Sequence, residues 1–187
     1  MQNLWQKKLK LKYSKDVFDI VQFGSSLFEN SKLNDVDIGV IFNKIPIKEQ
    51  LIQAQSIKEQ LEEFSEIPIH ISSFDLYSFF DDGNFAKEGI LFYGKSLISG
   101  EYFSKRFGLI SRVQIYYSLE KLKKKDKVRF NYMLNGKAGN YGLLRKYNGK
   151  LLKPGLISVE PICEKVFADS VGKLIKSFEI KKIFISE

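Results

Sequence analysis

Short apolar runs separated by polar turns dominate the first hundred residues of the chain. VFDIVQF at Val17–Phe23 and VDIGVIF at Val36–Phe42 are rich in β-branched residues and predict two buried strands. Ile67–Ser72 predicts a third strand and Gly89–Tyr93 a fourth. Between the second and third runs, apolar residues recur every three or four positions, which predicts an amphipathic helix over 47–64. The apolar positions of that helix are Ile47, Leu51, Ala54, Ile57, Leu61 and Phe64.

The pattern changes after residue 101. Leu109–Leu122 has helical spacing, and Arg129–Leu134 predicts a further helix. A glycine-rich loop then precedes one or two helical turns at Leu143–Tyr147. Two short strands are expected at Leu151–Lys153 and Leu156–Val159, with the Pro154-Gly155 turn between them. The remaining expected elements are a helix from Pro161 to about Phe178 and a terminal strand at Lys182–Ile185.

These elements predict an α/β (α+β) protein of two parts. Residues 1–105 are expected to form a small mixed sheet with helices, and residues 106–187 a basic, mostly helical module. The order of elements in the second part suits a winged-helix-like module. The alternative is a helical extension that packs on the first part and shapes a cleft for a second substrate.

Composition narrows the class of protein. With 187 residues, 44% hydrophobic and 28% charged, the chain has ordinary globular composition and is neither disordered nor collagen-like. One cysteine, Cys163, allows no internal disulfide, and one histidine, His70, excludes a His-rich metal site. The chain has no run of 18 apolar residues, and its basic N-terminus lacks the apolar core of a signal peptide. A cytoplasmic protein without a membrane span is therefore expected.

The net charge of +8 is unevenly distributed. Residues 1–100 carry 11 Lys and 14 Asp and Glu, a net charge of −3, whereas residues 101–187 carry 19 Lys and Arg and 8 Asp and Glu, a net charge of +11. A basic surface binds polyanions through phosphate contacts and release of counterions. The competing interpretation is that these lysines only form a solvated surface.

The segment Phe23–Phe42, FGSSLFENSKLNDVDIGVIF, contains the candidate chemistry. Asp35 and Asp37 stand at the start of the second strand, where residues i and i+2 project to the same side, roughly 7 Å apart. Two adjacent carboxylates repel each other, and a divalent cation such as Mg²⁺ or Mn²⁺ relieves that repulsion. The competing interpretation is a pair of solvated acids at a sheet edge.

The first strand ends in Gly24-Ser25-Ser26. Gly24 allows a phosphate to approach the backbone closely. Ser25 and Ser26, with backbone N–H groups at a helix start, can donate to that phosphate. A role for Ser25 as a helix N-cap is compatible with this. The pattern thus combines donors for a triphosphate with acids for its metal.

These residues resemble the DNA polymerase β-like nucleotidyltransferase superfamily, and specifically its minimal nucleotidyltransferases. The shared pattern is an apolar strand, Gly24-Ser25, about ten residues, and Asp35-Val36-Asp37 in the next strand. Phe85–Gly94 is similar to the closing segment of the family. The resemblance covers residues 15–100 and implies a Mg²⁺-dependent transfer of a nucleotidyl group from a nucleoside triphosphate to a hydroxyl of RNA, a protein or a small molecule.

The family has a third carboxylate on the next core strand, and the equivalent stretch here holds His70. A neutral imidazole can act as a base, so His70 is a candidate catalytic residue beside Asp35 and Asp37. It is a poorer ligand for Mg²⁺ than a carboxylate. Asp75 could replace the third carboxylate only if the chain turns back towards Asp35 and Asp37. The competing interpretation of His70 is a half-buried strand residue without a catalytic role.

A different function is compatible with the same sequence. Without the third acid, the chain is a catalytically degenerate protein of this fold that binds nucleic acid or serves as an antitoxin-type partner of another protein, since some family members pair with a small helical toxin. Basic residues interleaved with Tyr141 and Tyr147 suit RNA or DNA, with charges for phosphates and rings for stacking. The candidate nucleic-acid-binding residues are Lys123, Lys124, Lys125, Lys127, Arg129, Arg145 and Lys146.

Overall fold

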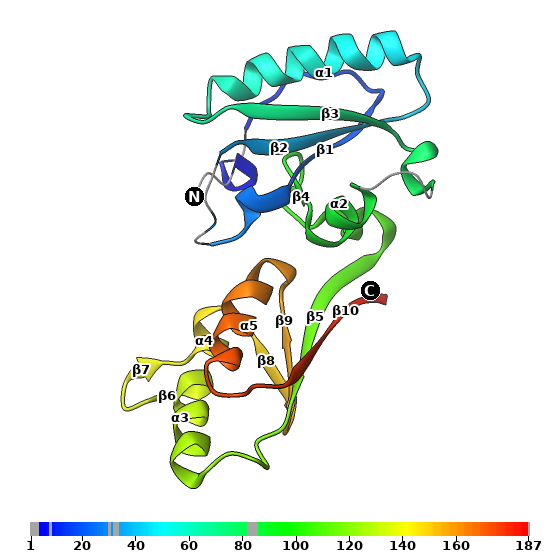
Figure 1. The fold of residues 1–187 in the computed structure, drawn as a ribbon. Helices are drawn as coiled ribbons and strands as arrows, with labels where there is room; N and C mark the ends of the chain where they lie inside the picture. Colours follow the sequence, from blue (N-terminus) through cyan, green and yellow to red (C-terminus); the bar gives the residue numbers. More distant parts are fainter. Residues whose placement is uncertain (1–3, 8, 30, 32–33, 82–85, 187) are drawn as a thin grey trace. The chain divides into compact units, whose positions relative to one another are not determined.

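The chain divides into two compact units, Met1–Leu109 and Ile110–Glu187, whereas the sequence placed the boundary after residue 105 (Figure 1). The computed structural model describes residues 4–7, 9–29, 31, 34–81 and 86–186. Both helices and strands are present in each unit, so the protein is of the mixed α and β class. Over the described ranges, none of the helices has the length and apolar character needed to cross a membrane.

A four-stranded mixed sheet in the order β3-β2-β1-β4 forms the centre of the first unit. The strands β1 (Val17–Phe23) and β2 (Val36–Phe42) are antiparallel neighbours, as the two apolar runs predict. β3 (Ile69–Asp75) lies parallel to β2, and the two-residue β4 (Lys95–Ser96) pairs with β1. β2 is therefore an inner strand, with a neighbour on each side.

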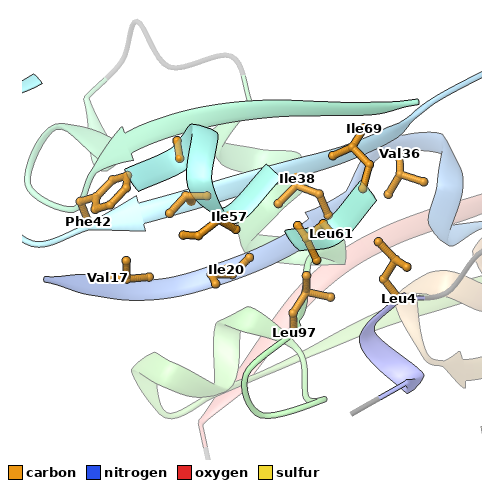
Figure 2. Close-up of a cluster of buried hydrophobic side chains, with 12 residues drawn as sticks. Leu4, Val17, Ile20, Val36, Ile38, Phe42, Ile57, Leu61, Ile69 and Leu97 are labelled. Atoms are coloured by element: carbon orange, nitrogen blue, oxygen red, sulfur yellow. The ribbon is translucent and has the colours of Figure 1, made fainter. Parts of the chain in front are cut away.

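Helix α1 (Ile47–Glu62) connects β2 to β3 and covers one face of the sheet. Ile57 and Leu61 pack over the strands with Ile20 and Ile38 (Figure 2). The expected apolar stripe is wrong at its start, because Ile47 and Leu51 are 61% and 57% exposed and Gln50 is buried. The Gln50 amide donates to the Ile45 carbonyl oxygen, which satisfies the buried polar group.

The other face of the sheet is covered by short helical elements and aromatic rings. Helix α2 (Lys87–Tyr93) occupies the segment where a fourth strand was expected, so that expectation is wrong. A run of five apolar residues does not distinguish a strand from a buried helix, and here the Ile90 N–H donates to the Ala86 carbonyl oxygen. The 3₁₀ turns η3 and η4 complete this layer. η3 spans Ser78–Phe80 and η4 spans Phe103–Phe107. The buried hydrophobic residues on this face are Val21, Ile41, Phe79, Ile90 and Phe103.

The second unit is built on another four-stranded sheet, in the order β10-β5-β9-β8, so it is not mostly helical. Strand β5 (Leu109–Tyr117) stands where a helix was expected. Ser111, Val113 and Ile115 alternate with more exposed positions, and this period of two matches a strand. The strands β8 (Lys150–Lys153) and β9 (Leu156–Val159) confirm the two predicted strands around the Pro154-Gly155 turn.

The helices of the second unit are short. α3 spans Lys124–Asn135 and so begins five residues before the helix predicted at Arg129–Leu134, whereas α4 spans Leu143–Lys146, within the predicted helical turns. The expected helix from Pro161 to Phe178 is too long: a 3₁₀ turn, η5 (Pro161–Cys163), leads into α5 (Glu164–Gly172). Phe178 instead begins the terminal strand β10, which ends at Ser186. The described residues also form η1 (Leu4–Gln6), η2 (Gly24–Leu27), β6 (Gly136–Lys137) and β7 (Asn140–Tyr141).

Candidate functional site

Gly24 and Asp37 meet where β1 ends and β2 begins. Phe23 and Asp37 are paired residues in the antiparallel ladder, so Gly24 directly follows the residue opposite Asp37. Gly24 has a φ of +75°, which side chains rarely adopt. A Cβ atom at Gly24 would collide with Asp37 Oδ2 and come within 3.1 Å of Asp37 Cγ. The glycine therefore leaves the space that the Asp37 carboxylate occupies.

Asp35 and Asp37 belong to the start of an inner strand rather than a sheet edge. Asp37 is the second residue of β2, and its side chain is 24% exposed. Asp35 directly precedes the strand and is partly buried. On the opposite side, Val36, Ile38 and other apolar residues of β2 are fully buried, as the alternation predicts.

His70 lies beside Asp37 in the parallel β2–β3 ladder, in which the two are paired residues. His70 Nδ1 lies 3.2 Å from Asp37 Oδ1, within hydrogen-bond distance. The His70 side chain is 66% exposed, so its description as a half-buried strand residue is wrong. If Nδ1 carries the proton, it donates to Asp37, and Nε2 then keeps its lone pair.

Asp75 does not replace the missing carboxylate. It pairs with Phe42, at the opposite end of β3 from His70. Five residues along a strand span about 16 Å. The Asp75 carboxylate instead accepts hydrogen bonds from the Tyr77 and Ser78 N–H groups, at 2.9 Å and 3.3 Å. The Asp75 carboxylate thus stabilises the turn that leads into η3.

The two serines after Gly24 have different environments. Ser25 is exposed, whereas Ser26 is buried and its hydroxyl contacts Gln22 Nε2 at 3.0 Å and the Phe23 carbonyl oxygen at 3.3 Å. Ser26 therefore supports the turn, and Ser25 is the serine that a phosphate can reach. Ser25 is not an N-cap, since Phe23 holds that position of η2. With only four residues, η2 offers backbone N–H groups but little helix dipole.

Sequence reasoning missed Gln22, although a glutamine in the middle of an apolar strand is an unusual choice. Gln22 is fully buried, and its Oε1 accepts the Leu4 N–H at 3.0 Å while its Nε2 donates to Ser26. Because a buried amide without partners is costly, these contacts fix the side chain beneath the turn that holds Gly24. Gln22 is thus a second support of the candidate site.

The acidic side chains fit a hard cation that keeps water and phosphate ligands. Among the described residues, no three His, Cys, Asp or Glu side chains are grouped closely enough to hold a metal by themselves. Mg²⁺ is usually held by one or two carboxylates together with substrate phosphates and water, which suits Asp35 and Asp37. Because residue 24 is a glycine, Asp37 Oδ2 can lie directly against its backbone.

The expected basic residues lie in the second unit. Lys123 precedes α3, and Lys124 and Lys125 lie in its first turn. Arg145 and Lys146 are the last residues of α4 and are exposed. Lys127 is partly buried, and Arg129 Nη1 lies 3.6 Å from Asp126 Oδ1.

No family model matches this chain, and comparisons with curated proteins and with solved structures likewise find no match.

Proposed function

We propose that the protein is a Mg²⁺-dependent nucleotidyltransferase that uses a nucleoside triphosphate as its substrate. The observation that supports this most is the contact between Gly24 and Asp37, with Asp35 two residues before. It places a glycine turn directly against one of two neighbouring carboxylates, the residue types that phosphates and their metal require.

Each residue has a distinct role in this proposal. Asp35 and Asp37 hold the cation, and the exposed Ser25 donates to a phosphate oxygen from its hydroxyl or its N–H. Bound Mg²⁺ supplies neutralisation of phosphate charge at the site. His70 acts as a positioning residue, because its Nδ1 lies within hydrogen-bond distance of Asp37 Oδ1 and orients that carboxylate.

The reaction forms one bond and breaks one. The oxygen of the acceptor hydroxyl bonds to the α-phosphorus, the bond from that phosphorus to the bridging oxygen breaks, and pyrophosphate leaves. The hydroxyl proton passes to solvent. The acceptor is a hydroxyl of RNA, of a protein or of a small molecule. Catalysis here consists mainly of positioning and electrostatic stabilisation.

Transfer of a radiolabelled α-phosphate tests this function. The purified full chain is incubated with each of the four labelled nucleoside triphosphates, Mg²⁺ or Mn²⁺, and either total RNA or lysate protein. Asp35→Asn and Asp37→Asn remove one charge each while preserving size. Asp81→Asn is the matched control, because Asp81 is exposed and lies in the same unit.

Label that reaches an acceptor with the wild type and Asp81→Asn, and drops at least about 100-fold with Asp37→Asn, is the expected result. Transfer that persists in both site variants would exclude this site. If the wild type shows no label transfer and nucleoside triphosphates do not stabilise it in the presence of metal, the proposed function is excluded.

A second function is favoured by one observation: the residue of β3 that is paired with Asp37 is His70, and not an acid. In that case the site binds metal and nucleotide without turnover, in a nucleic-acid-binding or antitoxin-type partner protein. Metal-dependent thermal stabilisation by a nucleoside triphosphate, lost in Asp37→Asn and without any label transfer, would identify it.

A further inference from the structure

The basic character of the second unit is concentrated in one stretch of the chain. Residues 121–153 carry 11 Lys and Arg but a single acid, Asp126. The other residues of 110–187 carry six Lys and Arg and six Asp and Glu, so their charges cancel. All of the +10 net charge of the unit therefore comes from the segment that forms α3, the β6–β7 hairpin, α4 and β8.

Helix stability does not account for these lysines. Lys124 and Lys125 lie in the first turn of α3, where positive charge opposes the helix dipole. Only Asp126 offsets them there, and its Oδ1 lies 3.6 Å from Arg129 Nη1. A concentration of charge that does not favour its own helix indicates a role in binding.

Two exposed tyrosines stand within this basic stretch, each with a cation over its ring. The Tyr141 side chain is 66% exposed, and the Arg145 guanidinium carbon lies 3.9 Å from its ring centroid. Tyr132 is 45% exposed, with Lys137 Nζ 5.0 Å from its ring centroid. The Arg145 guanidinium therefore lies over the Tyr141 ring and brings a positive charge to it.

A tight hairpin carries the Tyr141 ring, whereas Tyr132 lies in α3. β6 and β7 pair through Gly136–Tyr141 and Lys137–Asn140, and the two-residue turn Ala138-Gly139 has φ values of +43° and +87°. A Cβ atom at Gly136 would collide with the Asn140 carbonyl oxygen. The hairpin lies beside the end of α3 (Figure 1). Because the hairpin backbone is fixed this closely, ordering it costs little entropy when a ligand binds to Tyr141.

We propose that α3, the β6–β7 hairpin and α4 form a binding surface for single-stranded nucleic acid. Bases stack on Tyr141 and Tyr132, and Lys137 and Arg145 contact the phosphates that flank each stacked base. Base stacking on aromatic rings together with a basic groove is the recognition mode of single strands, whose bases are free to leave the stack. This surface is independent of the proposed transferase site, and either one can exist without the other.

Fluorescence anisotropy with labelled 20-nucleotide oligomers tests the proposal on the full chain. The probes are oligo(U) RNA, oligo(dT) DNA and a 20-base-pair DNA duplex, each at 50 and 200 mM KCl. The variants are Tyr141→Ala, Tyr141→Phe and Arg145→Gln. Tyr77→Ala is the matched ring control, because Tyr77 is 73% exposed in the first unit, and Lys173→Gln is the charge control.

Tighter binding of at least one single strand than of the duplex is expected. Tyr141→Ala should weaken that binding roughly 5- to 100-fold, and Tyr141→Phe should restore most of it, since stacking needs only the ring. Arg145→Gln should reduce the slope of log affinity against log salt by about 0.7. The two single-stranded probes identify which sugar is preferred.

Three results would overturn the proposal: no binding to either single strand at 50 mM KCl, equal or tighter binding of the duplex, or a Tyr141→Ala effect no larger than that of Tyr77→Ala. Thermal unfolding of each variant distinguishes loss of binding from loss of fold. Tyr141→Ala and Arg145→Gln alter exposed side chains, so unchanged unfolding temperatures are expected.

Discussion

The carboxylate of Asp37 occupies the space that a side chain at residue 24 would fill. Gly24 has a φ of +75°. The residue before Gly24, Phe23, is paired with Asp37 in the β1–β2 ladder. The backbone geometry of one strand end and the acid at the start of the next are thus coupled. Asp37 Oδ1 lies near His70 Nδ1, and Asp37 Oδ2 lies at Gly24. A single carboxylate therefore connects the end of β1, the start of β2 and the start of β3.

Gly24→Ala should destabilise the protein and, together with that, impair the nucleotide transfer that we propose. The left-handed backbone costs a non-glycine residue about 1–2 kcal/mol, and displacement of Asp37 adds to that cost. Chemical denaturation and label transfer measure the two effects. Gly89→Ala is the control: Gly89 lies in α2, and a Cβ atom added there would meet nothing within 4 Å, so about 0.5–1 kcal/mol of stabilisation is expected. A Gly24→Ala variant with full stability and transfer would refute the coupling.

His70 variants separate a positioning role from a role as a base. His70→Ala should reduce transfer at least about tenfold, because Asp37 loses the group that orients it. His70→Asn keeps a short donor in the place of Nδ1 and should restore most of the transfer. Both variants should unfold at the wild-type temperature, since the side chain is 66% exposed. If the asparagine variant is as inactive as the alanine variant, proton transfer by His70 is the better explanation.

Asp19 should make the free energy of unfolding depend on pH. The carboxyl is 1% exposed, and burial raises its pKa above the ordinary 3.8, although hydrogen bonds from Ser96 and the Ile20 N–H and the charge of Arg106 act in the opposite direction. With a raised pKa, the folded state holds the proton more tightly than the unfolded state does. The contribution of Asp19 to the free energy of unfolding is therefore greatest below pH 3.8 and falls as the pH rises through its folded-state pKa.

Asp19→Asn is the variant that isolates this effect. Its amide oxygen accepts from the same donors, which lie 2.6 Å and 2.8 Å from Asp19 Oδ1, but it does not titrate. The free energy of unfolding of the wild type should fall relative to this variant as the pH is raised from 3.8. Urea titrations from pH 3 to pH 8 measure the difference, and a difference that stays constant with pH would contradict the prediction.

Two isoleucines on α1 provide a test of the core. Ile57 is 1% exposed and packs against the sheet, whereas Ile52 is 70% exposed on the same helix. Ile57→Ala should cost about 2–5 kcal/mol through lost burial and the cavity left behind. Ile52→Ala should change stability by no more than about 0.5 kcal/mol. Equal effects in denaturant titrations would mean that α1 does not pack as described.

The amino-acid sequence alone predicts three of the four strands of the first sheet, β1, β2 and β3, and the helix α1 that covers them. β1 and β2 are apolar runs, and the alternation in β2 correctly placed Val36 and Ile38 in the core. Hydrophobic burial on a pleated strand has a fixed period of two, so such positions are readable without knowledge of the neighbours. Asp35, Asp37 and Gly24 were found in the same way, by their spacing at strand ends.

Elements whose local pattern is ambiguous could be assigned only from the fold. Gly89–Tyr93 is a helix rather than a strand, and Leu109–Tyr117 is a strand rather than part of a helix. Short apolar runs bury equally well in either form, and the surrounding layer selects between them. The apolar stripe predicted for α1 is wrong at its start for a related reason. The elements packed around α1 decide which of its faces meets the sheet, and Ile47 lies on an exposed face.

The contacts of the candidate site also required the fold. His70 and Asp37 are 33 residues apart, and only the parallel register of β2 and β3 brings them within 3.2 Å. The same register places Asp75 at the far end of the strand and so excludes it from the site. Sequence spacing identifies residue types along one strand, whereas pairing between strands is a non-local choice made by the packing of the whole sheet.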